Sequence, residues 1–389
     1  MPIVQRIAEL HAEMTGWRRD IHAHPELGFE ENRTADLVAL KLESFGLDVH
    51  RGIGRTGVVG VLRAGKGQKT LGLRADMDAL PIQEANQFPH RSTHAGRMHA
   101  CGHDGHTTML LGAARYLAET RAFDGTVHFI FQPAEEGIGG AKAMIDDGLF
   151  RRFPCEAVFG MHNRPGLPVG RFAVKSGSMM AGGAFFDIDI TGVGSHGARP
   201  ESSVDPVLVA AHMTAVLQTI VSRNVRPVET AVLSVTQIHA GDAYNVIPQT
   251  ARLSGTVRAF SMDVMELVRK NMARAAEGVA ASMGARAVTD FRLIFAPLVN
   301  NEQEAEFAAS ICNEIVGADN VNRNPAPVMA SEDFAFMLNE VPGCYINLGN
   351  GAGEGACEVH NPAYDFNDSA LPYGASFFAR AVETRLAPR

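Results

Sequence analysis

Apolar residues in the first half of the chain alternate between short, nearly continuous runs and longer helical patterns. The runs at 69–75, 126–132 and 156–161 are rich in β-branched and aromatic residues, which is typical of strands buried on both faces. Residues 106–120 carry apolar side chains at helical spacing, and Asp104 is placed to cap that helix. This alternation predicts an α/β sheet with right-handed crossovers.

The middle of the chain has a different pattern. Between residues 182 and 295 the periodicity predicts the order β-α-β-β-α-β, which matches a ferredoxin-like unit. A helix at 302–316, a strand at 344–350 and a helix at 371–387 then return to α/β. We therefore expect one α/β domain interrupted by an inserted domain. The predicted bounds are 1–181 and 296–389 for the two parts of the α/β domain, and 182–295 for the insertion.

Polar clusters follow four of the predicted strands. They contain Asp76 and Asp78 in "RADMDALP", Glu135 and Glu136 in "FQPAEEG", His162 in "GMHN", and His360 in "EVHNP". In parallel α/β sheets, ligands bind in the crevice beyond the carboxyl ends of the strands. Four runs that each place a carboxylate or imidazole at this edge predict one shared site.

The segment "MHACGHDGH" carries three histidines, one cysteine and one aspartate within nine residues. Cys101 and His103 stand two residues apart, which puts both on one side of an extended backbone. His99 would lie on that side too, so spacing alone does not select the ligands. Thiolate, imidazole and carboxylate together suit Zn²⁺, with Mn²⁺ or Co²⁺ tolerated. The adjacent pair Glu135–Glu136 could divide two tasks, since one carboxylate can bind metal while the other takes a proton.

Each cluster also has a purely structural interpretation. "PAEE" is a good helix start, because proline suits the first turn and acids suit the positive end of the helix dipole. "DMD" could be a solvated turn, and "HACGH" a polar loop with a free thiol. A single histidine such as His162 or His360 is more often structural than a ligand.

Composition excludes several classes of partner. The 389 residues are 46% hydrophobic and 20% charged, which gives enough apolar mass for two domains. A formal charge of −8 argues against a nucleic-acid or anionic-membrane partner, which would need a basic face. Five scattered cysteines, with no signal-peptide pattern and no apolar run long enough to span a bilayer, indicate the reducing cytoplasm.

Seven motifs occur in the order found in one known family. They are "WRRDIHAHPELGFEE", "RADMDALPIQE", "MHACGHDGH", "FQPAEEG", "GMHN", "ASEDFA" and "HNPAYDFND". Together, over nearly the full chain, they resemble the M20 metallopeptidase-like amidohydrolases. The nearest branch contains hippurate hydrolases, N-acyl-amino-acid amidohydrolases and plant auxin-conjugate hydrolases.

The resemblance implies a mixed-sheet catalytic domain that holds two divalent metal ions. The implied ligands are Cys101, His103, Glu136, His162 and His360. Glu135 matches the general base, and Asp78 matches an acid that orients a metal ligand. Most of the wider family has a histidine where Asp76 stands here, and Cys101 enters the site. That departure leaves the metal open between Zn²⁺ and Mn²⁺, with Co²⁺ or Ni²⁺ as alternatives.

For the inserted domain, the resemblance implies a lid and dimerisation role. His196 in "GVGSHGARP" matches a histidine that reaches an active site, often that of the partner subunit. Asn245 and Arg258 match positions that hold the polar end of the substrate. We therefore expect a homodimer, or a tetramer built from dimers, whose substrate is a small molecule.

The expected reaction is hydrolysis of the amide bond of N-acyl amino acids. Within the same family, a dipeptidase or an N-acetyl-diaminopimelate deacetylase is the alternative. A cysteine hydrolase using Cys101 would leave the acidic residues without a role. A metal-dependent binding protein would not need the base Glu135.

Overall fold

A computed structural model describes residues 3–352 and 357–388. The ends of the predicted domains at residues 1–2 and 389, and residues 353–356 within the last of them, lie outside the described residues. The chain divides into two compact units. The larger consists of Met1–Gly177, Val299–Ala326 and Asp333–Arg389, and the smaller of Ser178–Leu298 and Pro327–Glu332. The roles expected for these units, catalysis for one and a lid or dimer contact for the other, stay predictions.

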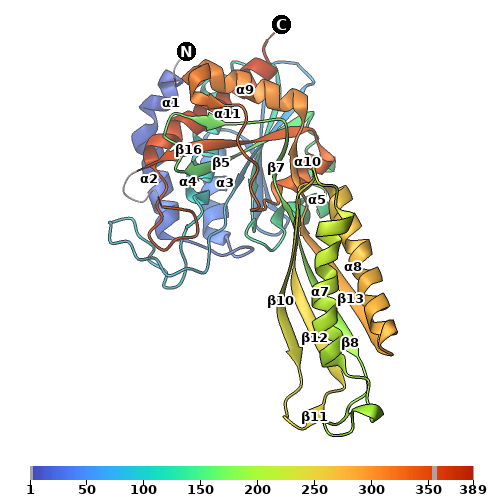
Figure 1. Cartoon of the computed structure of the whole chain (residues 1–389). Coiled ribbons are helices and arrows are strands. Elements are labelled where there is room, and N and C mark those ends of the chain that lie inside the picture. Colours follow the sequence, from blue (N-terminus) through green and yellow to red (C-terminus); the bar gives the residue numbers. More distant parts are fainter. Residues whose placement is uncertain (1–2, 353–356, 389) are drawn as a thin grey trace. The chain divides into compact units, whose positions relative to one another are not determined.

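An eight-stranded mixed sheet forms the centre of the larger unit, in the order β1-β2-β4-β3-β5-β16-β6-β15 (Figure 1). Strands β4, β3, β5 and β16 run parallel, whereas β1 and β2 are antiparallel to their neighbours. The strands of the sheet are β1 (Asp48–Ile53), β2 (Gly57–Ala64), β3 (Thr70–Asp76), β4 (Gly125–Gln132), β5 (Ala157–Pro165), β6 (Phe172–Ala173), β15 (Val321–Asn322) and β16 (Gly343–Gly351). Every residue of β4 is buried, as its continuous apolar pattern predicts. The predicted mixed α/β sheet is confirmed.

Helices of the larger unit pack on this sheet or on one another. They are α1 (Gln5–Glu9), α2 (His11–Ala23), α3 (Asn32–Ser44), α4 (His103–Thr120), α5 (Gly140–Asp146), α6 (Leu149–Arg152), α9 (Glu302–Val316), α10 (Phe334–Glu340) and α11 (Leu371–Arg385). Helix α4 packs against β3 and against α2, α3 and α11. Its polar first turn is therefore as deeply buried as its apolar body. No helix within the described residues has both the length and the hydropathy needed to cross a bilayer.

The start of α4 differs from the prediction. The helix begins at His103, so Asp104 lies inside the first turn and caps nothing. The backbone before it is not extended either, because Gly102 has a φ of +95°. A side chain at Gly102 would meet the amide of Asn163 and the hydroxyl of Tyr364. Glycine is thus required for both conformation and space, and it turns the chain between Cys101 and His103.

The smaller unit has the element order β8–α7–β10–β12–α8–β13, which is the β-α-β-β-α-β succession expected from the periodicity. Its antiparallel sheet has the order β10-β12-β8-β13, and α7 and α8 pack on it (Figure 1). The elements are β8 (Gly182–Thr191), α7 (Pro206–Asn224), β10 (Ala231–Ala240), β12 (Thr250–Ala259), α8 (Met262–Ser282) and β13 (Arg286–Phe295), with a two-stranded ribbon of β9 (Ser195–His196) and β11 (Val246–Ile247). Short strands β7 (Gly177–Met180) and β14 (Leu298–Asn300) lie where the chain passes between the units.

Candidate metal centre

The carboxyl ends of the parallel strands bring the predicted residues to one edge of the sheet. Strand β3 ends at Asp76, two residues before Asp78, and β4 ends three residues before Glu135. His162 lies near the end of β5, which pairs with β3 on one side and β16 on the other. This is the edge at which the sequence predicts a shared site.

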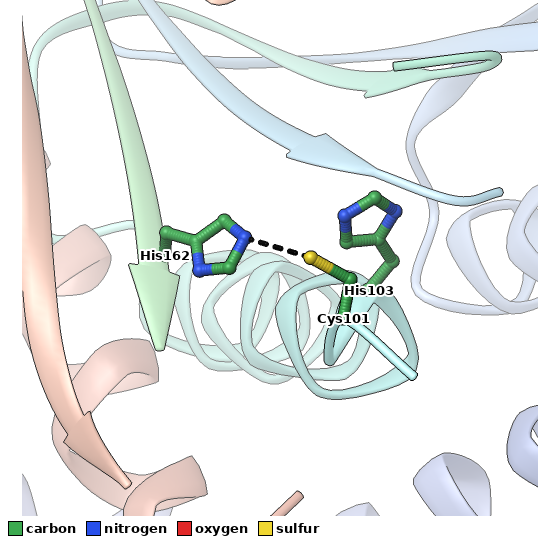
Figure 2. Close-up of side chains that lie close together, drawn as sticks. All are labelled: Cys101, His103 and His162. Carbon is green, nitrogen blue, oxygen red and sulfur yellow. Dashed lines mark hydrogen bonds between the residues drawn. The ribbon is translucent and has the colours of Figure 1, made fainter. Parts of the chain in front are cut away.

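Cys101, His103 and His162 form the first group of possible ligands (Figure 2). Their ligand atoms all lie within 4.8 Å of one another, and the Cys101 Sγ atom is 3.3 Å from His162 Nε2. His162 Nδ1 lies 2.7 Å from the carbonyl oxygen of Asn163, so it donates its proton there. The lone pair of Nε2 therefore faces the thiol, which is the arrangement a metal ligand needs.

Glu136 joins the remaining ligands to this group. Its Oε1 atom lies 3.2 Å from His360 Nε2 and 3.9 Å from His103 Nε2. Cys101, Glu136 and His360 also have ligand atoms within 4.8 Å of one another. The five residues predicted as ligands thus share one small region of the larger unit.

This region fits a cation. The buried Nε2 atom of His103 has no hydrogen-bond partner among the described residues. Buried polar atoms are rarely left unpaired, so this nitrogen is available for another ligand. A thiolate, imidazoles and a carboxylate match the donor set of Zn²⁺ and related divalent ions.

Asp78 contacts two of these ligands at once. Its Oδ1 atom is 3.1 Å from His103 Nδ1, and its Oδ2 atom accepts a 2.9 Å hydrogen bond from the backbone N–H of Glu136. The first contact leaves Nε2 of His103 free, and the second fixes the loop that carries Glu136. These are the contacts expected of a residue that orients metal ligands.

Glu135 lies on an irregular loop, not at a helix start. The next helix, α5, begins only at Gly140, and Ala134 has a φ of +53°. Glu31 holds the loop, because its carboxylate accepts hydrogen bonds from Ala134 N–H (2.8 Å) and Thr56 Oγ1 (2.5 Å). Burial raises the pKa of Glu31 to about 7. The structural interpretation of "PAEE" is therefore wrong, since tertiary hydrogen bonds set this backbone.

Spacing alone does not select among the histidines of "MHACGHDGH", and the structure separates them. His99 is buried, and neither of its ring nitrogens has a partner among the described residues. It belongs to none of the possible ligand groups found there. His106 instead lies against Asp76, with 2.6 Å between Nδ1 and Oδ1. His106 stands three residues after His103. A predicted helix that began at His103 would therefore have placed both histidines on the same helix face.

A buried ionic cluster anchors the other side of the α4 terminus. Arg18 of α2 contacts Asp104, Asp365 and Asp368, and His22 donates hydrogen bonds to Asp104 (2.8 Å) and Glu84 (3.2 Å). Burial lowers the pKa of His22, but the hydrogen bonds to the two carboxylates outweigh it and raise the pKa to about 9. The cluster ties α4 to α2 and to the segment that follows His360. This cluster could not be predicted from the sequence, because no local pattern marks these residues as partners.

The cluster predicts a pH dependence of stability. The folded pKa of His22 lies above its ordinary value of 6.5, so the protonated ring stabilises the fold below pH 6.5. That contribution is lost as the pH rises through 9. The charged and titratable groups that face His22 are Arg18, Glu84, His90, His99, Asp104 and Asp365.

His22→Gln should isolate this effect in metal-free protein. The difference in unfolding free energy between wild type and variant should shrink by roughly 2–3 kcal/mol between pH 6.5 and 9. Urea titration followed by fluorescence of Trp17, the single tryptophan, measures it. A difference that stays constant over this range would contradict the assigned protonation of His22.

The three remaining predicted residues belong to the smaller unit. His196 lies on β9 and Asn245 directly precedes β11, and the Asn245 carbonyl accepts a 2.7 Å hydrogen bond from Gly197 N–H. Both side chains are exposed. Arg258 lies on β12, where Nη1 donates to Thr256 Oγ1 (2.8 Å) and to the Val257 carbonyl (3.1 Å). The structure thus brings His196 close to Asn245 and places Arg258 on a separate strand.

Known proteins are similar to this chain over most of its length. Residues 72–384 match the model of Peptidase family M20/M25/M40. Hippurate hydrolase of Campylobacter jejuni is 43% identical over 98% of both chains. The IAA-amino acid hydrolase ILR1-like 2 of Arabidopsis thaliana is 40% identical over 93% of this chain and 82% of its own.

A solved structure is also similar. The Bacillus subtilis YXEP protein, a dinuclear metal-binding peptidase of the M20 family, superposes with a TM-score of 0.85. It is 35% identical, and the match covers 97% of this chain and 99% of that one. The chain therefore belongs to peptidase family M20/M25/M40, in the amidohydrolase branch that its motifs predict.

Proposed function

We propose that this enzyme hydrolyses the amide bond of N-acyl amino acids, using two divalent metal ions held by Cys101, His103, Glu136, His162 and His360. The observation that carries the proposal is the placement of two adjacent glutamates. Ligand atoms of His103, Glu135 and Glu136 all lie within 4.8 Å of one another. One carboxylate can therefore bind metal while its neighbour stays within reach of the attacking water.

Bound divalent ions would supply Lewis-acid chemistry, which polarises a carbonyl group and lowers the pKa of water toward neutrality. Glu135 removes a proton from the attacking water and then delivers it to the leaving amine. Asp78 keeps His103 and the Glu136 loop in place during both transfers. His196 donates a hydrogen bond to the tetrahedral oxyanion, a role that typically contributes about 10²–10³ in rate.

Arg258 is proposed to bind the substrate carboxylate, with Asn245 as a second polar contact. Guanidinium groups suit this task because they can bind a carboxylate through two parallel hydrogen bonds. Arg258 is half-buried, and within the smaller unit its guanidinium donates to the neutral oxygens of Thr256 and Val257.

The names of the relatives support the substrate class. Hippurate and IAA-amino acid conjugates are both amino acids whose nitrogen carries an acyl group. For the metal we propose Zn²⁺ or Mn²⁺, because one thiolate among nitrogen and oxygen ligands is borderline soft. We further propose a cytoplasmic homodimer, or a tetramer built from two dimers, formed through the smaller unit.

The substrate class can be tested with a panel of N-benzoyl, N-acetyl and indole-acetyl amino acids beside dipeptides with a free amine. We expect kcat/KM to be at least about 10²-fold higher for N-acyl substrates, since a free ammonium group would lie against the metal ions. Release of primary amine measures turnover. Preferential cleavage of dipeptides would replace the proposal with a dipeptidase. Activity that resists chelators but is lost on thiol alkylation would indicate a cysteine hydrolase.

A further inference from the structure

A chain of buried polar side chains begins behind the metal centre at Asp76. Both carboxylate oxygens of Asp76 are engaged, since Oδ1 lies 2.6 Å from His106 Nδ1 and Oδ2 lies 2.8 Å from Arg74 Nη1. Arg74 also donates to Gln132 Oε1 at 2.8 Å and approaches Asp333 at 3.4 Å. All of these side chains are at most 1% exposed. Because a carboxylate only accepts, His106 Nδ1 must carry a proton.

The other nitrogen of His106 contacts Asn163. Nε2 lies 2.6 Å from Asn163 Oδ1 and 3.0 Å from its backbone nitrogen. The opposite end of the Asn163 amide lies 2.6 Å from the hydroxyl of Tyr364. Since Nδ1 carries the proton, Nε2 accepts from the Asn163 backbone N–H, and the side-chain amide is satisfied when its NH₂ group donates to Nε2 and its oxygen accepts from the Tyr364 hydroxyl. Asn163 is thus held at both ends of its side chain.

Asn163 in turn sets the orientation of His162. Its carbonyl oxygen accepts the Nδ1 proton of His162 at 2.7 Å, which leaves Nε2 facing Cys101 Sγ at 3.3 Å. The Asn163 side chain also fills the space above Gly102, the residue that turns the chain between Cys101 and His103. A shift of Asn163 would therefore disturb ligands on both sides of the centre.

We infer that Arg74, Asp76, His106 and Asn163 form a positioning network that fixes the imidazole of His162 and the turn at Gly102 for metal binding. This rests on the proposed ligand roles of His162 and Cys101. Asp76, His103 and His106 also lie close enough together to hold an ion themselves. The guanidinium of Arg74 argues against that alternative, because it already neutralises Asp76 and would repel a cation there.

Two conservative variants break the network at different points. His106→Gln can retain only the contact to Asn163, and Asp76→Asn changes a single atom. Partners behind metal ligands typically contribute about 10–100-fold to metal affinity. We expect both variants to bind Zn²⁺ about 10–100-fold more weakly in competition with a chromogenic chelator. In Co²⁺-loaded protein, the thiolate-to-metal absorption band should weaken or shift.

His99→Gln is the matched control, because His99 is an equally buried histidine of the same segment that lies outside the network. It should keep the wild-type Zn²⁺ affinity and Co²⁺ spectrum. Affinities of His106→Gln and Asp76→Asn within about twofold of this control would overturn the inference. So would unfolding of both variants while the control folds, since the network would then serve the fold alone.

His162→Ala separates this inference from the proposed function. If His162→Ala loses one metal ion while the two network variants keep the wild-type metal affinity, the positioning role of the network is wrong and the proposed metal centre still holds. If His162→Ala retains both ions at wild-type affinity, the ligand assignment itself fails.

Discussion

Glu135→Gln is expected to lower kcat by about 10²–10⁴ while both metal ions stay bound. Glutamine keeps the shape of the side chain and can still contact the Asp333 backbone N–H that Glu135 Oε1 accepts at 3.3 Å. It cannot take a proton from water. The loss should reach the upper end of the range, because the same carboxylate also returns the proton to the leaving amine. Steady-state kinetics and metal analysis of one preparation measure both effects.

Glu136→Gln is the matched control for this prediction. The two residues are adjacent, but Glu136 faces His360 and His103, whereas Glu135 is not among the predicted ligands. Glu136→Gln should therefore lose metal together with activity, and added metal should restore part of that activity. Added metal should not rescue Glu135→Gln. Near-normal kcat in Glu135→Gln would show that the base lies elsewhere.

Removal of metal is expected to abolish activity, and Cys101→Ser should make that removal easier. A serine hydroxyl is a poor replacement for a soft thiolate, so the loss of affinity should be larger for Zn²⁺ than for Mn²⁺. Dialysis against a chelator, followed by titration with each metal and assay of turnover, measures both. A wild-type enzyme that stays active without bound metal would contradict the whole scheme.

Cys155→Ser provides the control for the thiol. Cys155 contacts His128 on β4, away from the ligand groups, and burial raises its pKa to about 12. Its replacement should leave the affinity for both metals unchanged. Equal losses in the two cysteine variants would mean that serine disturbs the fold, and would leave Cys101 without a specific role.

The sheet and the place of the site could be predicted from the sequence, because both follow from short-range patterns. Continuous apolar runs mark strands buried on both faces, and polar residues such as Asp78 and Glu135 follow the strand ends directly. Since the carboxyl ends of parallel strands share one edge, residues far apart in the sequence are expected to lie together there.

The local geometry could not be predicted, because it depends on tertiary partners. Asp104 has the sequence context of a helix N-cap, yet its side chain is buried and forms ion pairs with Arg18 and His22. "PAEE" has the composition of a helix start, yet a hydrogen bond from Ala134 N–H to Glu31 holds it as a loop. His106 was not identified, because its partner Asp76 lies 30 positions earlier in the chain.

The central claim is that two metal ions lie among Cys101, His103, Glu136, His162 and His360. An anomalous difference map from a crystal of the Mn²⁺- or Zn²⁺-loaded enzyme, collected on either side of the metal's absorption edge, tests it directly. We expect two peaks, each within bonding distance of atoms from these five side chains, and none between Asp76 and His106. A single peak, or peaks bound by other residues, would contradict it.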